Sequence, residues 1–142
     1  MRKEKSCGAV VYKTEQSIRY YLIEYMKKGH VSIPKGHVEN NETEEETALR
    51  EIKEETNLDV KLNTSFRHSI CYSPEEGVMK DVIFFLATPT SQRLINQECE
   101  VSALDWLPFE KALAALTFES DKETLSLAEE FISRNIPPSQ NE

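Results

Sequence analysis

The chain has 142 residues, a net charge of -8 and a pI near 5.0, and its size allows one compact domain with a hydrophobic core. This acidity argues against binding DNA or an anionic membrane, because both interactions depend on lysine and arginine side chains that neutralise phosphates. No apolar run approaches the roughly 20 residues that span a bilayer, and the three cysteines lack zinc-site spacing, so we expect a cytoplasmic protein with free thiols.

The first part of the chain predicts two strands followed by a loop. Residues 6–14 (SCGAVVYKT) and 18–26 (IRYYLIEYM) are rich in β-branched and aromatic residues, which favours two strands joined by a polar turn. Residues 33–41 (IPKGHVENN) read as the loop. In it Pro34 stiffens the chain, and Gly36 lets the backbone approach a ligand or turn left-handed.

A helix is predicted from about Thr43 to Asn57. Asn41 or Thr43 can cap its start, and Thr43 with Glu46 fits a capping box, in which each side chain satisfies a backbone donor at the other position. Asn57 tolerates the left-handed backbone that is common after a helix. One face of the helix is expected to pack on a sheet: Ala48, Leu49, Ile52 and Thr56.

The rest of the chain predicts more strands and then helices. Three strands are expected, at residues 58–72, 80–89 and 102–108. Pro108 suits the first turn of a helix that continues through KALAAL, and residues 122–136 form a terminal amphipathic helix, followed by a frayed tail at 137–142. This order predicts a single domain over residues 1–142 with an α/β (α+β) fold, in which a mixed sheet lies between helices.

Three carboxylates of the first helix share one face. Glu51, Glu54 and Glu55 are spaced i, i+3 and i+4, and such a face is either simply solvated or binds a cation. Like charges at i+4 cost about 0.2 to 0.5 kcal/mol per pair, and Arg50 and Lys53 are expected to project away from this face. We therefore favour a divalent cation, and an all-oxygen ligand set suits magnesium or manganese.

The spacing around these glutamates resembles the Nudix box. The matching positions are Gly36, Glu42, Arg50, Glu51, Ile52, Glu54, Glu55 and Leu58, whereas Asn57 stands where the box has glycine. The order of strands and helices is also similar to the Nudix fold along nearly the whole chain. The departure at Asn57 is mild, since asparagine follows glycine in tolerating a positive φ.

The resemblance implies hydrolysis of a nucleoside diphosphate linked to another group, by attack of water on phosphorus, with Mg²⁺ or Mn²⁺ as cofactor. It implies that Glu51 is the first choice for the general base and that Arg50 orients a glutamate, with Glu54 also catalytic and Glu42 supporting the box. The implied metal ligands are the Gly36 carbonyl, Glu51, Glu54, Glu55 and a later carboxylate, for which Glu100 fits better than Glu98.

Within the family, PKGHVE followed by ETALREIKEET is similar to the asymmetric diadenosine tetraphosphate hydrolases. This resemblance implies that Lys35, His37 and Lys80 contact phosphates and that Tyr72 stacks on adenine, although each could be an ordinary surface or core residue. Two alternatives remain: a Nudix enzyme acting on nucleoside triphosphates, nucleotide sugars or RNA 5′ ends, and a nucleotide sensor without catalysis. The protein could be a monomer or a homodimer.

Overall fold

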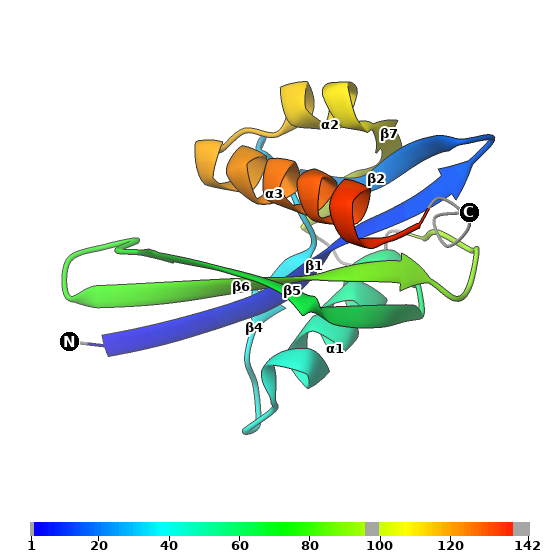
Figure 1. Ribbon diagram of the computed structural model, residues 1–142. Coiled ribbons are helices and arrows are strands. Elements are labelled where there is room, and N and C mark those ends of the chain that lie inside the picture. Colours follow the sequence, from blue (N-terminus) through cyan, green and yellow to red (C-terminus); the bar gives the residue numbers. More distant parts are fainter. Residues whose placement is uncertain (1, 96–99, 138–142) are drawn as a thin grey trace.

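The computed structural model describes residues 2–95 and 100–137 (Figure 1). The elements in these residues are, in chain order, β1 (Arg2–Glu15), β2 (Ile18–Met26), β3 (Val31–Ser32), β4 (Lys35–His37), α1 (Glu44–Thr56), β5 (Val60–Tyr72), β6 (Val78–Pro89), β7 (Val101–Pro108), α2 (Phe109–Ala115) and α3 (Glu119–Asn135). Among the described residues, no helix combines the length and the apolar composition needed to cross a membrane.

The strands form a mixed sheet, as predicted. Its main path runs β3-β2-β1-β6-β5, while β4 pairs with β1 and β7 pairs with β2. The long strand β1 lies parallel to β6 through residues 2–11 and antiparallel to β2 through residues 12–15. Strand β1 therefore connects β2 and β3 on one side to β6 and β5 on the other.

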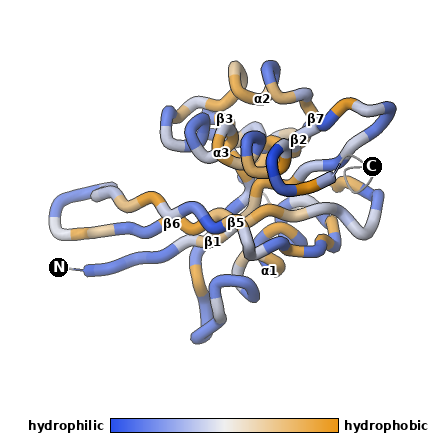
Figure 2. Tube along the Cα trace, viewed as in Figure 1, coloured by the Kyte–Doolittle hydropathy of each residue, from blue (hydrophilic) through white to orange (hydrophobic). Residues whose placement is uncertain are grey.

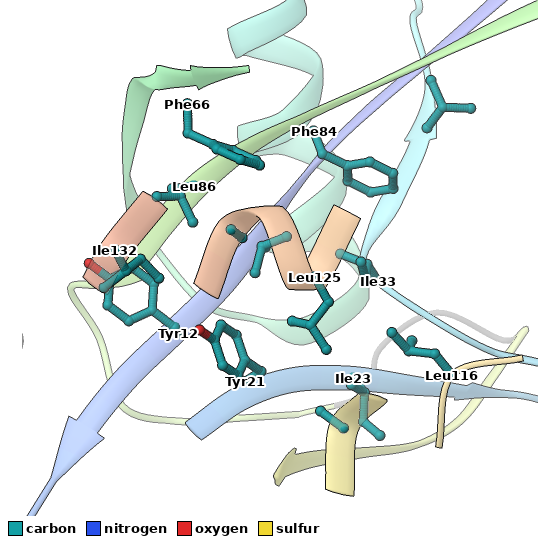
Figure 3. Close-up of a cluster of buried hydrophobic side chains, with 14 residues drawn as sticks. Tyr12, Tyr21, Ile23, Ile33, Phe66, Phe84, Leu86, Leu116, Leu125 and Ile132 are labelled. Atoms are coloured by element: carbon teal, nitrogen blue, oxygen red, sulfur yellow. The ribbon is translucent and has the colours of Figure 1, made fainter. Parts of the chain in front are cut away.

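Helices cover both faces of the sheet, with α1 on one side and α2 and α3 on the other (Figure 1). Strand β6 shows why, since its side chains alternate between two buried clusters. Val82, Phe84 and Leu86 pack with residues of α2 and α3, whereas Ile83, Phe85 and Ala87 pack with Ala48 and Ile52 of α1. Figure 3 shows the first cluster, and Figure 2 shows apolar segments of the chain gathered where the layers meet.

The ends of α1 confirm the predicted caps. The Thr43 hydroxyl accepts from the Glu46 amide at 3.1 Å, and the Thr43 amide donates to the Glu46 carboxylate at 2.9 Å, which completes the capping box. Asn57 adopts the left-handed conformation, with φ 69°. The predicted packing face is wrong at Leu49, which is 41% exposed, because the buried face is turned toward Glu51 and Glu55.

Strand boundaries also differ from the prediction. Residues 35–37, expected in a loop, form β4 because the edge of β1 supplies hydrogen-bond partners from Ser6 to Gly8. Gly8 permits this approach, since a Cβ there would lie 1.9 Å from the Pro34 carbonyl oxygen. Strand β1 begins at Arg2, earlier than predicted, because residues 2–5 pair with β6. Strand β6 and helix α3 also begin earlier than predicted, at Val78 and Glu119. The frayed tail lies largely outside the described residues and, like the single domain, stays a prediction.

Candidate active site

Arg50 lies at the centre of the carboxylate cluster, so the expectation that it projects away is wrong. Its guanidinium donates to Glu42 through Nε at 2.6 Å and Nη2 at 2.9 Å, and Nη1 reaches Glu51 at 2.8 Å and Glu54 at 3.0 Å. Nη2 also donates to the His37 carbonyl at 2.8 Å, which ties α1 to β4. The hydrogen bonds from Arg50 are the main reason that the pKa of Glu42 is lowered to about 2. Arg50 therefore forms ion pairs with Glu42, Glu51 and Glu54, and its role in the reaction stays a prediction.

Lys53 is directed away from the cluster, as expected. Its ammonium donates to the Asn57 carbonyl at 3.1 Å and lies 3.3 Å from the Asp59 carboxylate. It therefore neutralises the end of the helix and not its acidic face.

Gly36 makes room for Glu51. The Gly36 backbone lies on β4 against α1, and a Cβ at this position would be 1.9 Å from Glu51 Cδ and 2.1 Å from its Oε2. Glycine is needed here for this close approach and not for a left-handed turn, because the glycines with positive φ among the described residues are Gly29 and Gly77. The Gly36 backbone thus lies beside the carboxylate that the resemblance assigns as base.

The carboxylates differ in burial. Glu51 and Glu55 are only 8% and 6% exposed, whereas the Glu54 side chain is 45% exposed. Burial raises the pKa of Glu51, and the Arg50 guanidinium opposes this effect. The pKa of Glu55 is also raised, first by burial and then by Glu24.

Glu24 was not identified from the sequence. It lies on β2, is 1% exposed, and forms a hydrogen bond with Glu55. The signal that could have found it is a glutamate inside the apolar pattern YLIEY, where a charged side chain is expensive to bury without a partner.

Glu51, Glu54 and Glu55 line a cleft of about 430 Å³. Its lining combines carboxylates with lysine and histidine side chains: Glu39, Glu51, Glu54, Glu55 and Glu100, together with Lys28, His30, Lys35, His37 and Lys80, beside Ser6, Met26 and Gly36. Burial and then the proximity of Lys35 lower the pKa of Lys80, whose Nζ lies 3.4 Å from His37 Nε2. The tertiary structure thus brings together most of the predicted site residues, from β4, α1, β6 and the segment before β7.

Among the predicted substrate-binding residues, Tyr72 lies outside the lining of this cleft. Tyr72 lines a neighbouring cavity of about 400 Å³, and Lys35 lines both this cavity and the cleft. Glu98 lies outside the described residues. Cys7 and Cys71 are free thiols, as predicted, and Cys99 also lies outside the described part of the chain.

The fit of a metal ion can be tested on these contacts. Within residues 2–95 and 100–137, no three acidic, histidine or cysteine side chains already converge as a closed metal cage. Glu51 and Glu54 pair instead with Arg50, while Oε1 of the buried Glu55 has no hydrogen-bond partner. Mg²⁺ and Mn²⁺ favour oxygen ligands, and Mg²⁺ needs only one or two protein carboxylates, with water and substrate phosphates completing the shell. The residues therefore fit an ion that is held jointly with a phosphate ligand.

Comparison with known proteins identifies the class. The sequence matches the NUDIX domain over residues 3–128, and the chain therefore belongs to the Nudix family. It is a Nudix pyrophosphohydrolase, which acts on phosphoric anhydride bonds. Members of this family generally use a divalent metal ion.

Individual relatives cover most of the chain. The mouse asymmetrical bis(5′-nucleosyl)-tetraphosphatase is 31% identical over 140 residues, which cover 90% of this chain and 95% of the mouse protein. The crystal structure of the Caenorhabditis elegans Ap4A hydrolase binary complex superposes with a TM-score of 0.83 at 24% identity, covering 92% of this chain and 98% of that one. The NUDIX domain of Shewanella oneidensis NrtR, complexed with ADP-ribose, superposes with a TM-score of 0.77 at 16% identity, covering 93% and 90%. The two structures show that the fold is shared.

Proposed function

We propose that this Nudix enzyme hydrolyses diadenosine tetraphosphate or a related dinucleoside polyphosphate to ATP and AMP. The observation that carries the proposal is the cleft, which combines the acidic face of α1 with Lys35, Lys80 and His37. Such a site suits a polyphosphate chain, because lysines bind its oxygens directly and carboxylates bind it through a divalent cation. The mouse relative, whose name specifies an asymmetrical tetraphosphatase, supports this substrate class.

The chain's residues have distinct roles in this reaction. Glu51 takes a proton from the attacking water, whose oxygen bonds to phosphorus while the anhydride P–O bond breaks. Its raised pKa suits a base, and Arg50 holds its carboxylate in place at 2.8 Å. Lys35 and Lys80 bind the phosphate oxygens as their charge increases in the transition state.

A bound Mg²⁺ or Mn²⁺ would neutralise phosphate oxygens and polarise the scissile phosphorus. The residues that would hold it are the Gly36 carbonyl, Glu51, Glu54, Glu55 and Glu100. These ligands come from β4, α1 and the segment before β7, so they surround the cleft from different elements.

The nucleoside end of the substrate fits the neighbouring cavity. Tyr72 is 43% exposed there and offers a ring face for stacking on adenine. Tyr72 also pairs with Lys80 in the register of β5 and β6, so a base on this ring is next to a phosphate in the cleft. His37 remains a proposed phosphate contact at the other side of Lys80.

Product analysis tests the proposal. Purified protein with magnesium is incubated with diadenosine tetraphosphate, nucleoside triphosphates, nucleotide sugars and a triphosphorylated RNA, and the products are separated by ion exchange. We expect ATP and AMP from the dinucleotide at a rate well above that of the other compounds. Preferred turnover of another compound would refute the substrate, and nucleotide binding without turnover would point to a sensor.

A pair of lysine variants tests the cleft itself. Lys80→Met should raise the KM for the dinucleotide about tenfold, because a charge-assisted hydrogen bond to phosphate is lost. Lys111→Met on the exposed surface of α2 is the matched control and should leave KM unchanged. Equal kinetics for both variants would contradict the phosphate contact of Lys80.

A further inference from the structure

A second cavity, of about 400 Å³, adjoins the cleft through Lys35. Its remaining lining is mostly apolar: Ile70, Tyr72, Val82, Phe118, Ser120 and Asp121. Tyr72 and Phe118 are 43% and 51% exposed, and both aromatic rings line this cavity. The Phe118 ring also lies 5.7 Å from the ring of His30, a residue of the cleft. Cavity and cleft thus form one continuous binding surface.

Asp121 is a buried acidic residue in this mostly apolar cavity. It lies in the first turn of α3, is only 6% exposed, and faces apolar side chains and Ser120. Among the described residues its carboxylate has no hydrogen bond or ion pair, and Lys35 and His30 act on it only through space. Burying a carboxylate to this extent without a hydrogen-bond partner is costly, and Lys35 and His30 offset this cost only through space.

Neighbouring polar groups do not relieve this cost. Thr124, one turn further along α3, donates its hydroxyl to the Ser120 carbonyl at 2.9 Å and contacts His68 Nδ1 at 2.9 Å. The helix itself is held on the sheet by Glu129, which accepts from the Tyr21 hydroxyl and pairs with Arg19 at 2.6 Å. Beyond its favourable place in the first turn of α3, Asp121 makes no contact that secures the fold, although it is held at a defined position in the cavity wall.

We propose that Asp121 is a specificity residue that accepts a hydrogen bond from the exocyclic amino group of a purine base held in this cavity. A carboxylate oxygen is an acceptor, so it favours a base edge that presents N–H donors. Adenine and guanine both carry such an amino group, and the unsubstituted purine ring carries none. A base here has its flat faces toward Tyr72 and Phe118 and its phosphates toward Lys35.

This inference rests on the proposed function only in that the cleft binds nucleotide phosphates. It does not depend on which anhydride bond is cut. The test therefore uses nucleoside monophosphates, which have no anhydride bond to hydrolyse, and measures binding by calorimetry in magnesium buffer.

Three probes are compared: AMP, GMP and purine riboside 5′-monophosphate, which lacks both the amino group and a ring N–H. We expect the wild-type protein to bind AMP or GMP at least about tenfold more tightly than purine riboside monophosphate. In Asp121→Leu this preference should fall to within about twofold, whereas Glu123→Leu, two residues along and exposed, should retain it. The stronger of the AMP and GMP signals identifies which amino group is recognised.

Thermal unfolding gives a second readout. If Asp121 serves a ligand and not the fold, Asp121→Leu should melt at the same or a higher temperature, because an unsatisfied buried charge is removed. A lower melting temperature would show that Asp121 stabilises the fold. An unchanged base preference in Asp121→Leu, or no binding of any of the three probes to the wild type, would overturn the inference. If the wild-type protein showed the base preference but did not hydrolyse the dinucleotide, the proposed function alone would be refuted.

Discussion

Replacing Gly36 by alanine tests how the site is built. The new Cβ would lie 1.9 Å from Glu51 Cδ, and an ordinary contact needs 3.4 Å, so the carboxyl must retreat by about 1.5 Å. Glu51 is buried and fixed by Arg50, so this retreat disrupts its placement. A misplacement of about 1 Å can cost 100-fold in rate, and we expect kcat/KM to fall by about this factor, or about 2.7 kcal/mol.

Two other glycines provide matched controls for this substitution. Gly8→Ala would place its Cβ 1.9 Å from the Pro34 carbonyl oxygen, a backbone atom that cannot rotate away, so the protein should be strongly destabilised. At Gly77 a Cβ meets open space, and Gly77→Ala should cost about 1 kcal/mol of stability from its positive φ of 80°, with kcat/KM kept. Gly36→Ala differs from both, because the clashing atoms belong to a side chain.

The assay combines initial rates with magnesium and a thermal melt for each variant. We expect Gly36→Ala to fold, with a melting temperature close to that of the wild type, and to lose activity. Activity within about threefold of wild type would show that the position of Glu51 against β4 is unimportant for the reaction. Loss of the fold would show that the space at Gly36 is needed for packing.

Three further predictions concern charged residues. Glu54→Gln should lose at least about 100-fold in magnesium-dependent kcat with its melting temperature kept, and full activity would contradict the metal site. In Arg50→Lys the bidentate hydrogen bonding to Glu42 is lost, and kcat/KM should fall about 10- to 100-fold in steady-state kinetics. Arg67 lowers the pKa of Glu44 to about 2 from 4.5, so this stabilisation is complete above about pH 5 and is lost as the pH falls toward 2. In urea unfolding, Glu44→Gln should be less stable than wild type at pH 7 and should approach it near pH 2.

Local features of the sequence determined much of the first helix. The capping box of Thr43 and Glu46 and the left-handed Asn57 depend on neighbours a few residues away, so they were predicted correctly. The interior strand β6 was also predicted, because its apolar run reflects burial on both faces. Helical spacing placed the glutamates on one face for the same reason: periodicity is a property of the local backbone.

The tertiary structure alone decided how these groups meet. A long side chain such as Arg50 can follow several directions, and it turns into the cluster because Glu42 and the His37 carbonyl lie within its reach. Glu24 meets Glu55 only because β2 pairs with β1 in the sheet on which α1 packs. Strand β4 depends on the edge of β1 for its hydrogen bonds.

The position of Asp121 is also decided by the tertiary structure and not by the local sequence. In sequence it is one acidic residue among several at the start of a helix, where the helix dipole favours such residues. Only the packing of α3 on the sheet buries this carboxylate beside Tyr72 while leaving its neighbour Glu119 in water. Contacts between residues far apart in the chain depend on the relative placement of whole elements, and local patterns do not specify that placement.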